Sequence, residues 1–129
     1  MANLAPGFAA HPDYRIDLVP ETRRVRVEFA GATIADSTRA IRLEEEGHQP
    51  VHYIPEGDVR LDLLQPTAHH TRCPYKGECS YWTIEVPQAG TVKRSENAVW
   101  AYLDPYDEMQ AIGRHYAFYG SRVDKLAVG

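Results

Sequence analysis

The chain has 129 residues, of which 43% are hydrophobic and 25% charged, and its formal net charge is −4 at pH 7. This length and composition predict one folded domain with a single core, and they exclude a disordered or fibrous chain. The mild acidity and the scattered basic residues argue against a nucleic-acid partner, because a surface that binds nucleic acid usually carries a basic stripe.

The first 22 residues predict a loosely ordered arm that lies over the core. They have neither the basic start nor the continuous apolar run of a secretory signal. No stretch of the chain approaches the roughly 20 apolar residues that span a bilayer. We therefore expect a cytoplasmic protein with no membrane partner. In a reducing cytoplasm the two cysteines, Cys73 and Cys79, are expected to be free thiols.

From residue 23 onward, the residues alternate as in short β-strands. Over 23–29, valine and phenylalanine alternate with arginine and glutamate, which is the period of two of a strand with one buried face. The stretch at 30–32 predicts a tight turn and 33–37 a returning strand, so a hairpin is expected. Its arginines are expected to face solvent rather than to bind phosphate.

The middle of the chain predicts three more strands. Apolar and charged residues alternate over 40–46, which favours a strand over a helix. The stretch at 50–55 is rich in β-forming residues and bracketed by prolines, which suits an edge strand because proline cannot donate a ladder hydrogen bond. After a turn at 56–58, the alternation of 59–64 predicts a further strand.

Two longer strands are expected to meet at a turn. β-Branched and aromatic residues predict a strand at 80–86, and the sequence PQAG at 87–90 predicts a hairpin turn. Residues 91–104 are then expected to form one bent strand or two short ones, with their large aromatic side chains in the core.

One helix is predicted near the C-terminus, at 104–120. Asp104 suits the N-cap, Pro105 suits the first helical position and Gly120 suits the C-cap. Between them, apolar residues recur at helical spacing.

The whole pattern predicts a mainly β fold. Six to eight short strands in mostly antiparallel order would form a compact, barrel-like sheet closed by one C-terminal α-helix. The expected boundaries are an N-terminal arm at 1–22, a β-rich domain at 23–120 and a C-terminal tail at 121–129.

The sequence HHTRCPYKGECSYW at 69–82 concentrates much of the reactive chemistry. A structural zinc site usually needs two close pairs of cysteine or histidine ligands. Here five residues separate Cys73 from Cys79 and no second pair exists; His69 or another histidine would complete a mixed set, but no spacing requires it. We therefore expect no metal. A Cys73–Cys79 disulfide would close a small loop, but a reducing compartment disfavours it.

Cys73 is also a candidate nucleophile. The thiolate is the reactive form and nearby positive charge favours it; Arg72 precedes Cys73, Lys76 follows three residues later and His70 lies three residues before. Gly77 would let backbone N–H groups turn inward and bind an anion. The alternative is a buried cysteine that acts as a small apolar side chain, with Lys76 in solvent.

Five segments carry a family resemblance: RVRVEFAGATIADSTRAIRL, VHYIPEGDVRLDLL, CPYKGECSYWTIEV, NAVWAYLDP and IGRHYAFY. In order and spacing they resemble the domain of unknown function 427 family. The resemblance covers about residues 24–119. Its most specific mark is Cys-Pro-Tyr/Phe-Lys-Gly followed by a tyrosine four residues on, here Cys73 to Gly77 and then Tyr81.

The resemblance implies a compact, mostly β domain similar to the β-tent folds that include methionine sulfoxide reductase B. Many members have a histidine directly before the cysteine, where this chain has Arg72, and a small residue where it has Cys79. The Cys-x-x-Cys pairs of many β-tent proteins are missing. The family is sometimes labelled nucleotidyltransferase-like, but this sequence has no acidic metal-binding triad preceded by a Gly-Ser turn.

Two hypotheses for the function follow. In the first, the protein is a small enzyme that acts on a small anionic or carbonyl substrate without a cofactor. Cys73 would be its nucleophile or redox thiol, Lys76 an electrostatic activator or anion clamp, and His70 a base. Six further residues would complete the pocket: Arg39, Tyr53, Asp58, Tyr75, Gly77 and Tyr81.

In the second hypothesis, the protein is a non-catalytic β module that binds a small ligand or a partner. The CPYKG loop, residues 73–77, is then a structural turn. A pocket in which the Cys73 sulfur and the Lys76 amine converge favours the enzyme. A buried sulfur with an outward lysine favours the module.

Overall fold

The computed structural model describes residues 2–129, and strands dominate it. In chain order the strands are β1 (Ile16–Pro20), β2 (Val25–Phe29), β3 (Ala32–Ser37), β4 (Ile41–Glu45), β5 (Val51–Pro55), β6 (Leu64–Cys73), β7 (Gly77–Gln88), β8 (Thr91–Ala101), β9 (His115–Phe118) and β10 (Lys125–Val128). The helices are short: α1 (Pro6–Ala10) and the 3₁₀ turns η1 (Glu56–Asp58), η2 (Leu61–Leu63), η3 (Asp107–Ile112) and η4 (Gly120–Arg122).

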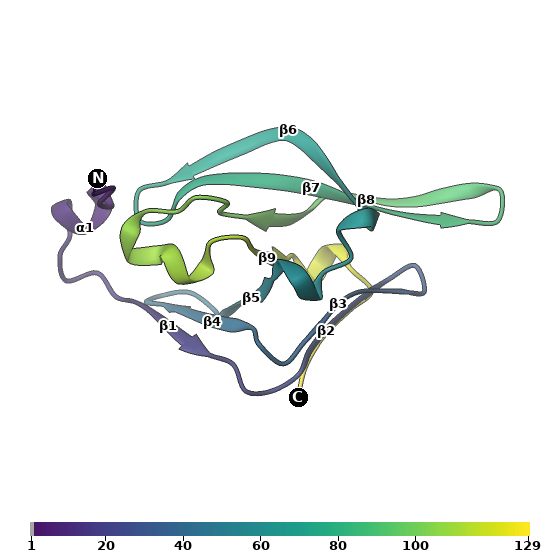
Figure 1. Cartoon of the computed structure of the whole chain (residues 1–129), viewed down its shortest axis with the longest axis horizontal. Helices are drawn as coiled ribbons and strands as arrows, with labels where there is room; N and C mark the ends of the chain where they lie inside the picture. The colour runs from purple at the N-terminus through teal and green to yellow at the C-terminus, as the bar shows by residue number, and fades with distance from the viewer. Residues whose placement is uncertain (1) are drawn as a thin grey trace.

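The strands form two antiparallel sheets. The large sheet has seven strands in the order β1-β4-β5-β9-β8-β7-β6, and the small sheet has three in the order β10-β2-β3. Figure 1 shows that the large sheet curls, so that β6, β7 and β8 lie across from β1 and β4. The predicted mainly β, antiparallel fold is confirmed, and its shape is a curled half-barrel.

Several predicted strands are present. The hairpin of β2 and β3 turns through Ala30 and Gly31, β4 is a strand rather than a helix, and β7 and β8 form the hairpin expected around 87–90. β8 is a single strand with an irregular register, and Asn97 within it has a φ of 50°.

The segments expected at the two chain ends also contribute strands. β1, within the predicted arm, pairs with β4 at the edge of the large sheet. β10, within the predicted tail, pairs with β2 at the edge of the small sheet. The sheets therefore extend beyond the 23–120 boundaries expected from the alternation pattern.

The predicted helix at 104–120 is wrong. The chain forms η3 and then, after Gly113, enters β9, which lies between β5 and β8. The helical spacing of apolar residues is outweighed here by ladder hydrogen bonds to two neighbouring strands, and His115–Phe118 is rich in β-forming residues. Local propensity is a weak guide where tertiary pairing competes with it.

Two details of the middle segment also differ from the prediction. Residues 59–64 do not form a strand: Val59 makes one isolated bridge to Ala35, and η2 follows before β6 begins at Leu64. β5 is not an edge strand, because β9 pairs with it on the side away from β4. The prolines that flank β5 lie where its ladder of hydrogen bonds ends. Their missing N–H groups therefore do not prevent β5 from lying inside the sheet.

Two apolar cores lie on opposite faces of the large sheet. The first lies between the two sheets, where the fully buried Val27 of β2 packs in one cluster with Ile84 of β7. The second lies on the other face and contains Cys79 and Tyr81 of β7 together with Ile112 of η3. Alternation along β7 sends its side chains to the two cores in turn.

No helix in residues 2–129 is both long enough and apolar enough to cross a membrane.

A buried carboxylate joins the connection after β1 to the large sheet. The Glu21 side chain is 2% exposed and accepts hydrogen bonds from Arg23 at 2.7 Å, from Arg42 of β4 at 3.2 Å, and from His52 of β5 at 2.9 Å. Its backbone N–H also donates to the Ala40 carbonyl at 2.8 Å. The hydrogen bond from Arg23, with further ones from His52 and Arg42, holds the pKa of Glu21 well below its usual range despite burial.

We expect Glu21→Gln to lower the free energy of unfolding by about 1–3 kcal/mol at pH 7, because it removes a charge-assisted hydrogen-bond acceptor from three donors. A carboxyl whose pKa is depressed in the folded state contributes stability above its unfolded pKa and loses it as pH falls. The difference between wild type and variant should therefore shrink below about pH 4.5. Urea unfolding at pH 7 and pH 3 measures it.

Asp62→Asn is the matched control, because it makes the same kind of change in the exposed Arg60–Asp62 pair. Its effect should stay under about 1 kcal/mol. A Glu21→Gln deficit that is equally large at both pH values contradicts the role given to the carboxylate.

Candidate functional site

The CPYKG loop connects β6 to β7 at one end of the half-barrel (Figure 1). Cys73 ends β6 and is the register partner of Gly77, which begins β7. Gly77 has a φ of 115°, which only glycine adopts readily. The loop is held from outside as well, because the Lys76 carbonyl accepts a hydrogen bond from the Tyr106 backbone N–H at 3.0 Å.

Lys76 points inward, as the enzyme hypothesis required and unlike the outward lysine of the alternative. Its side chain is 9% exposed, and its ammonium donates to the Glu45 carboxylate at 2.8 Å and to the Cys73 sulfur at 3.9 Å. Cys73 is half-buried. The structure thus brings together two of the three predicted catalytic residues, but it places a carboxylate beside them.

Glu45 has a second partner, the Tyr14 hydroxyl, which donates to its other oxygen. Burial alone would raise the pKa of Glu45, but hydrogen bonds from Lys76 and Tyr14 outweigh it and hold that pKa below its usual range. The hydrogen bond to Glu45 raises the pKa of Tyr14 to about 12. Cys73, Lys76, Glu45 and Tyr14 form what we call the Cys73 cluster.

Neither Glu45 nor Tyr14 was among the residues predicted for the site. The acidic run LEEEGH at 43–48 is typical of a solvated face, so charge alone does not single out Glu45. A signal was nevertheless present, because Glu45 has the same strand parity as Ile41 and Leu43 and so faces the side that they bury. Tyr14 carries no comparable signal, since the chain before β1 shows no periodicity.

His70 is not brought to Cys73. The register of β6 and β7 is regular from His70 to Cys73, so the two side chains, three positions apart, lie on opposite faces of the sheet. His70 lies near Ser80 at 3.4 Å and Glu78 at 3.8 Å on the outer face. The role of base for Cys73 therefore has no geometric support.

Arg39 and Asp58 pair with each other. The Arg39 guanidinium donates to the Asp58 carboxylate at 2.9 Å and 3.2 Å, and the Ser37 hydroxyl donates at 2.7 Å. Hydrogen bonds from Arg39 and Ser37 hold the pKa of Asp58 below its usual range despite burial. No hydrogen bond or ion pair of either side chain in residues 2–129 reaches the Cys73 cluster.

Tyr53 and Tyr81 are core residues. The Tyr53 hydroxyl accepts a hydrogen bond from the Trp100 indole at 3.2 Å, and the Tyr81 hydroxyl shares one with Thr71 at 2.9 Å. Burial raises the pKa of both tyrosines, that of Tyr81 to about 12. Both pack in the second core with Cys79, which is 1% exposed and whose thiol pKa is raised by burial.

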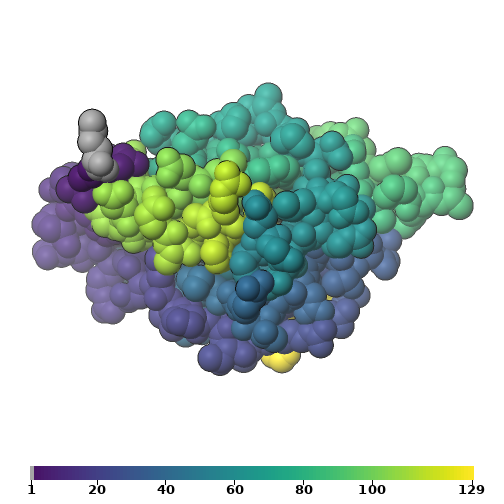
Figure 2. All heavy atoms as spheres, viewed as in Figure 1, coloured from purple at the N-terminus to yellow at the C-terminus, as the bar shows by residue number. Residues whose placement is uncertain are grey.

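Tyr75 contacts the N-terminal arm. Its ring stacks on that of Tyr14 with centroids 4.4 Å apart, and the Phe8 ring meets it edge-on at 4.9 Å. The Gly7 N–H donates to the Pro74 carbonyl at 2.9 Å, and a Cβ at Gly7 would lie 2.7 Å from the Tyr75 ring. Figure 2 shows this arm packed against the segment that contains η3, where Asp107 bonds Asn3.

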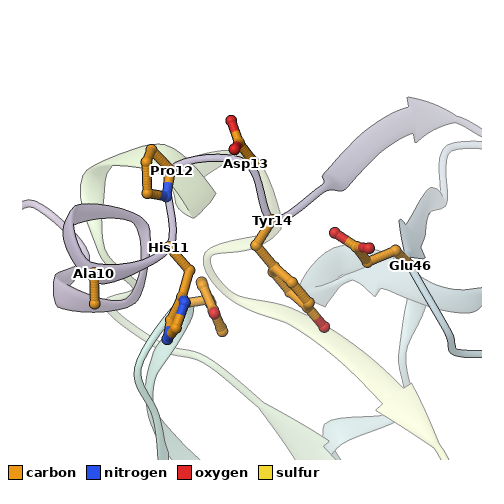
Figure 3. A pocket seen from close by; sticks show the side chains of 7 residues that line it. Ala10, His11, Pro12, Asp13, Tyr14 and Glu46 are labelled. Carbon is orange, nitrogen blue, oxygen red and sulfur yellow. The ribbon is translucent and has the colours of Figure 1, made fainter.

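An open groove of ≈ 630 Å³ lies between the arm and the loop. It is lined by Ala10, His11, Pro12, Asp13, Tyr14, Glu46 and Tyr75. Figure 3 shows the His11 and Tyr14 side chains extending to the same side and Glu46 reaching toward Tyr14, while the Asp13 carboxylate points the other way. Two carboxylates and two phenol rings thus border it, and the Glu46 carboxylate accepts only the Arg15 N–H, at 2.8 Å, among the bonds described for residues 2–129.

No group of three or more histidine, cysteine, aspartate or glutamate side chains within residues 2–129 is arranged to hold a metal ion. Cys73 and Cys79 are both free.

The fold and the Cys73 cluster define a small antiparallel half-barrel domain with a buried Lys–Glu pair beneath a Cys-Pro-Tyr-Lys-Gly turn. The model of a family described as a domain of unknown function, DUF427, matches residues 17–129, and the chain belongs to this family. The family predicted from the sequence is thereby confirmed. A search of curated proteins finds no match to the chain.

The Lys76–Glu45 pair gives a testable consequence for stability. We expect Glu45→Gln and Lys76→Met each to lower the free energy of unfolding by about 3 kcal/mol, because each leaves the other charge largely buried without its counter-charge. The double variant should lose clearly less than the sum of the two. Urea unfolding of all four proteins at pH 7 measures the coupling.

The exposed Arg60–Asp62 pair is again the control, and the same cycle there should give a coupling below about 1 kcal/mol. Strictly additive effects at Lys76 and Glu45 would show that the two charges do not depend on each other.

Proposed function

We propose that the protein is a ligand-binding β domain in which the CPYKG loop is structural and the groove beside it receives a small ligand. The observation that carries this proposal is the burial of Lys76, whose side chain is 9% exposed and bonded to Glu45 at 2.8 Å. The Cys73 sulfur and the Lys76 amine do converge, as the enzyme hypothesis required, but neither residue lines the groove beside the loop. The charge of Lys76 is already neutralised by Glu45, so Lys76 is a poor clamp for an incoming anion. The loop instead holds Tyr75 and the arm in the positions that form the groove.

The ligand class that the groove favours is a small organic cation. The anionic substrate expected from the sequence rested on basic side chains, and these are paired: Lys76 with Glu45, Arg39 with Asp58 and Arg72 with Glu78. The groove presents carboxylates and phenol rings instead. Carboxylates together with aromatic rings are the groups that attract an organic ammonium.

The finer fold type and the location are part of the same proposal. We infer a β-tent fold, which the curl of the seven-stranded sheet and the family membership support. We also infer a cytoplasmic location, which the two free thiols support.

A second candidate function is thiol chemistry at Cys73. The observation that favours it is the 3.9 Å separation between the Cys73 sulfur and the Lys76 nitrogen, since a nearby ammonium stabilises a thiolate. Glu45 opposes this effect because it neutralises the same ammonium. The half-buried Cys73 nevertheless contrasts with Cys79, which is almost completely buried.

Choline is a suitable probe for the groove. In a titration followed by ¹H–¹⁵N NMR, we expect saturable shifts confined to residues 10–14, 46 and 75, and none with acetate. Glu46→Gln and Asp13→Asn should each weaken binding roughly 2- to 5-fold, as expected for exposed charges. Glu96→Gln, the same change on an exposed part of β8, should leave it unchanged.

Neutral phenols and anions belong in the same titration. If choline and all of these probes leave the groove residues unperturbed, the groove is not a binding site and the first proposal fails.

Alkylation by iodoacetamide tests the thiol function. At pH 7 we expect Cys73 to react at least about 10-fold faster than Cys79, because burial keeps Cys79 protonated and inaccessible. Peptide mass spectrometry over time measures both rates. In Cys79→Ser protein, a Cys73 rate no higher than that of the unfolded chain at the same pH would argue against an activated thiol.

A further inference from the structure

We propose that Cys73 and Lys76 are a site of reversible oxidative crosslinking: peroxide converts the Cys73 thiol to a sulfenic acid, and the Lys76 amine captures it as a sulfenamide. The Cys73 sulfur and the Lys76 nitrogen are 3.9 Å apart in a tight turn. Cys73 is only half-buried, so peroxide can reach it. The crosslink needs only these residues and the carboxylate beside them, and it does not need the groove to bind a ligand.

The first step oxidises sulfur and reduces the peroxide. Cys73–SH and H₂O₂ give Cys73–SOH and H₂O, a two-electron oxidation of the thiol. In the second step the Lys76 nitrogen attacks the sulfenyl sulfur, the S–N bond forms and the S–O bond breaks. Cys73–SOH and Lys76–NH₃⁺ thus give Cys73–S–NH–Lys76, H₂O and H⁺.

Glu45 is the group placed to receive the proton that the second step releases. An ammonium has no free electron pair, so Lys76 must lose a proton before it attacks. The Glu45 carboxylate lies 2.8 Å from the Lys76 nitrogen and is placed to accept that proton. The flexible four-carbon stem of lysine accommodates the shortening of the S···N distance to a bond.

The surrounding chain disfavours two competing reactions of the Cys73 sulfenic acid. A sulfenic acid can condense with a neighbouring backbone nitrogen, but the residue after Cys73 is Pro74, which has no backbone N–H. A disulfide with Cys79 is disfavoured by position. Cys79 is the register partner of Thr71, so it lies diagonally from Cys73 at a Cα separation of roughly 7–8 Å, beyond the usual range of a disulfide.

The crosslink would change the site around it. It removes the charge of Lys76 and leaves Glu45 with Tyr14 as its remaining partner in the Cys73 cluster. Tyr14 stacks on Tyr75, and both line the groove. Oxidation at Cys73 would therefore affect the groove through the Glu45 carboxylate, which Lys76 and Tyr14 share.

The test uses Cys79→Ser protein, in which a disulfide within the chain cannot form. After one equivalent of hydrogen peroxide, intact mass spectrometry should show a product lighter by two hydrogen atoms. Trypsin should no longer cleave after Lys76, and dithiothreitol should restore both the mass and the cleavage. Lys76→Arg in the same background should lose this product at least 10-fold, because a guanidinium stays protonated. Lys93→Arg on the exposed hairpin should keep it.

Three results would overturn the proposal. One is a product that carries only added oxygen while trypsin still cleaves after Lys76. Another is trapping of the sulfenic acid by dimedone with no two-hydrogen loss when dimedone is omitted. The third is an undiminished two-hydrogen loss in folded Lys76→Arg protein. If Lys76→Arg does not fold, the trypsin and dithiothreitol results in Cys79→Ser protein decide alone.

Discussion

The ion pair between Lys76 and Glu45 is the contact on which the arrangement of the site depends. Glu45 ends β4, and Lys76 precedes β7, four positions away in the strand order of the large sheet. Only the curl of the sheet brings the two side chains to 2.8 Å. Because both are largely buried, the pair is a strong constraint: either charge left alone there would be costly. The position of the Cys73 sulfur and the bond from Tyr14 both follow from it.

The N-terminal arm is part of the site rather than a covering of the core. Gly7 approaches the loop closely enough to bond Pro74, and Tyr14 reaches Glu45 with its hydroxyl while it stacks on Tyr75 with its ring. The groove exists because of these contacts, since most of its lining comes from residues 10–14. These contacts connect the arm, the loop and β4, so a change at the buried Glu45 carboxylate can affect the open groove.

The neighbours of Cys73 and Lys76 change the chemistry that is expected of these two residues. A lysine near a cysteine suggests an activated thiol, but a carboxylate at 2.8 Å takes up the positive charge. The same carboxylate is also placed to receive the proton that the lysine must lose before it attacks an oxidised sulfur. Structural and chemical roles of the CPYKG loop are therefore compatible, and the groove supplies a surface for binding that does not use either residue.

The sequence by itself determined the β class of the fold, the hairpins, the CPYKG turn and the family, because alternation and turn residues act over a few neighbouring positions. The alternation of side chains along a strand also bears on two residues of the site. It places Glu45 on the same face as Leu43, and it keeps His70 off the face that carries Cys73. Tertiary structure alone decided that His115–Phe118 is a strand, that Tyr14 reaches Glu45 and that Lys76 is buried. These outcomes depend on ladder hydrogen bonds and on sheet curl between segments far apart in the chain, for which no local pattern carries a signal.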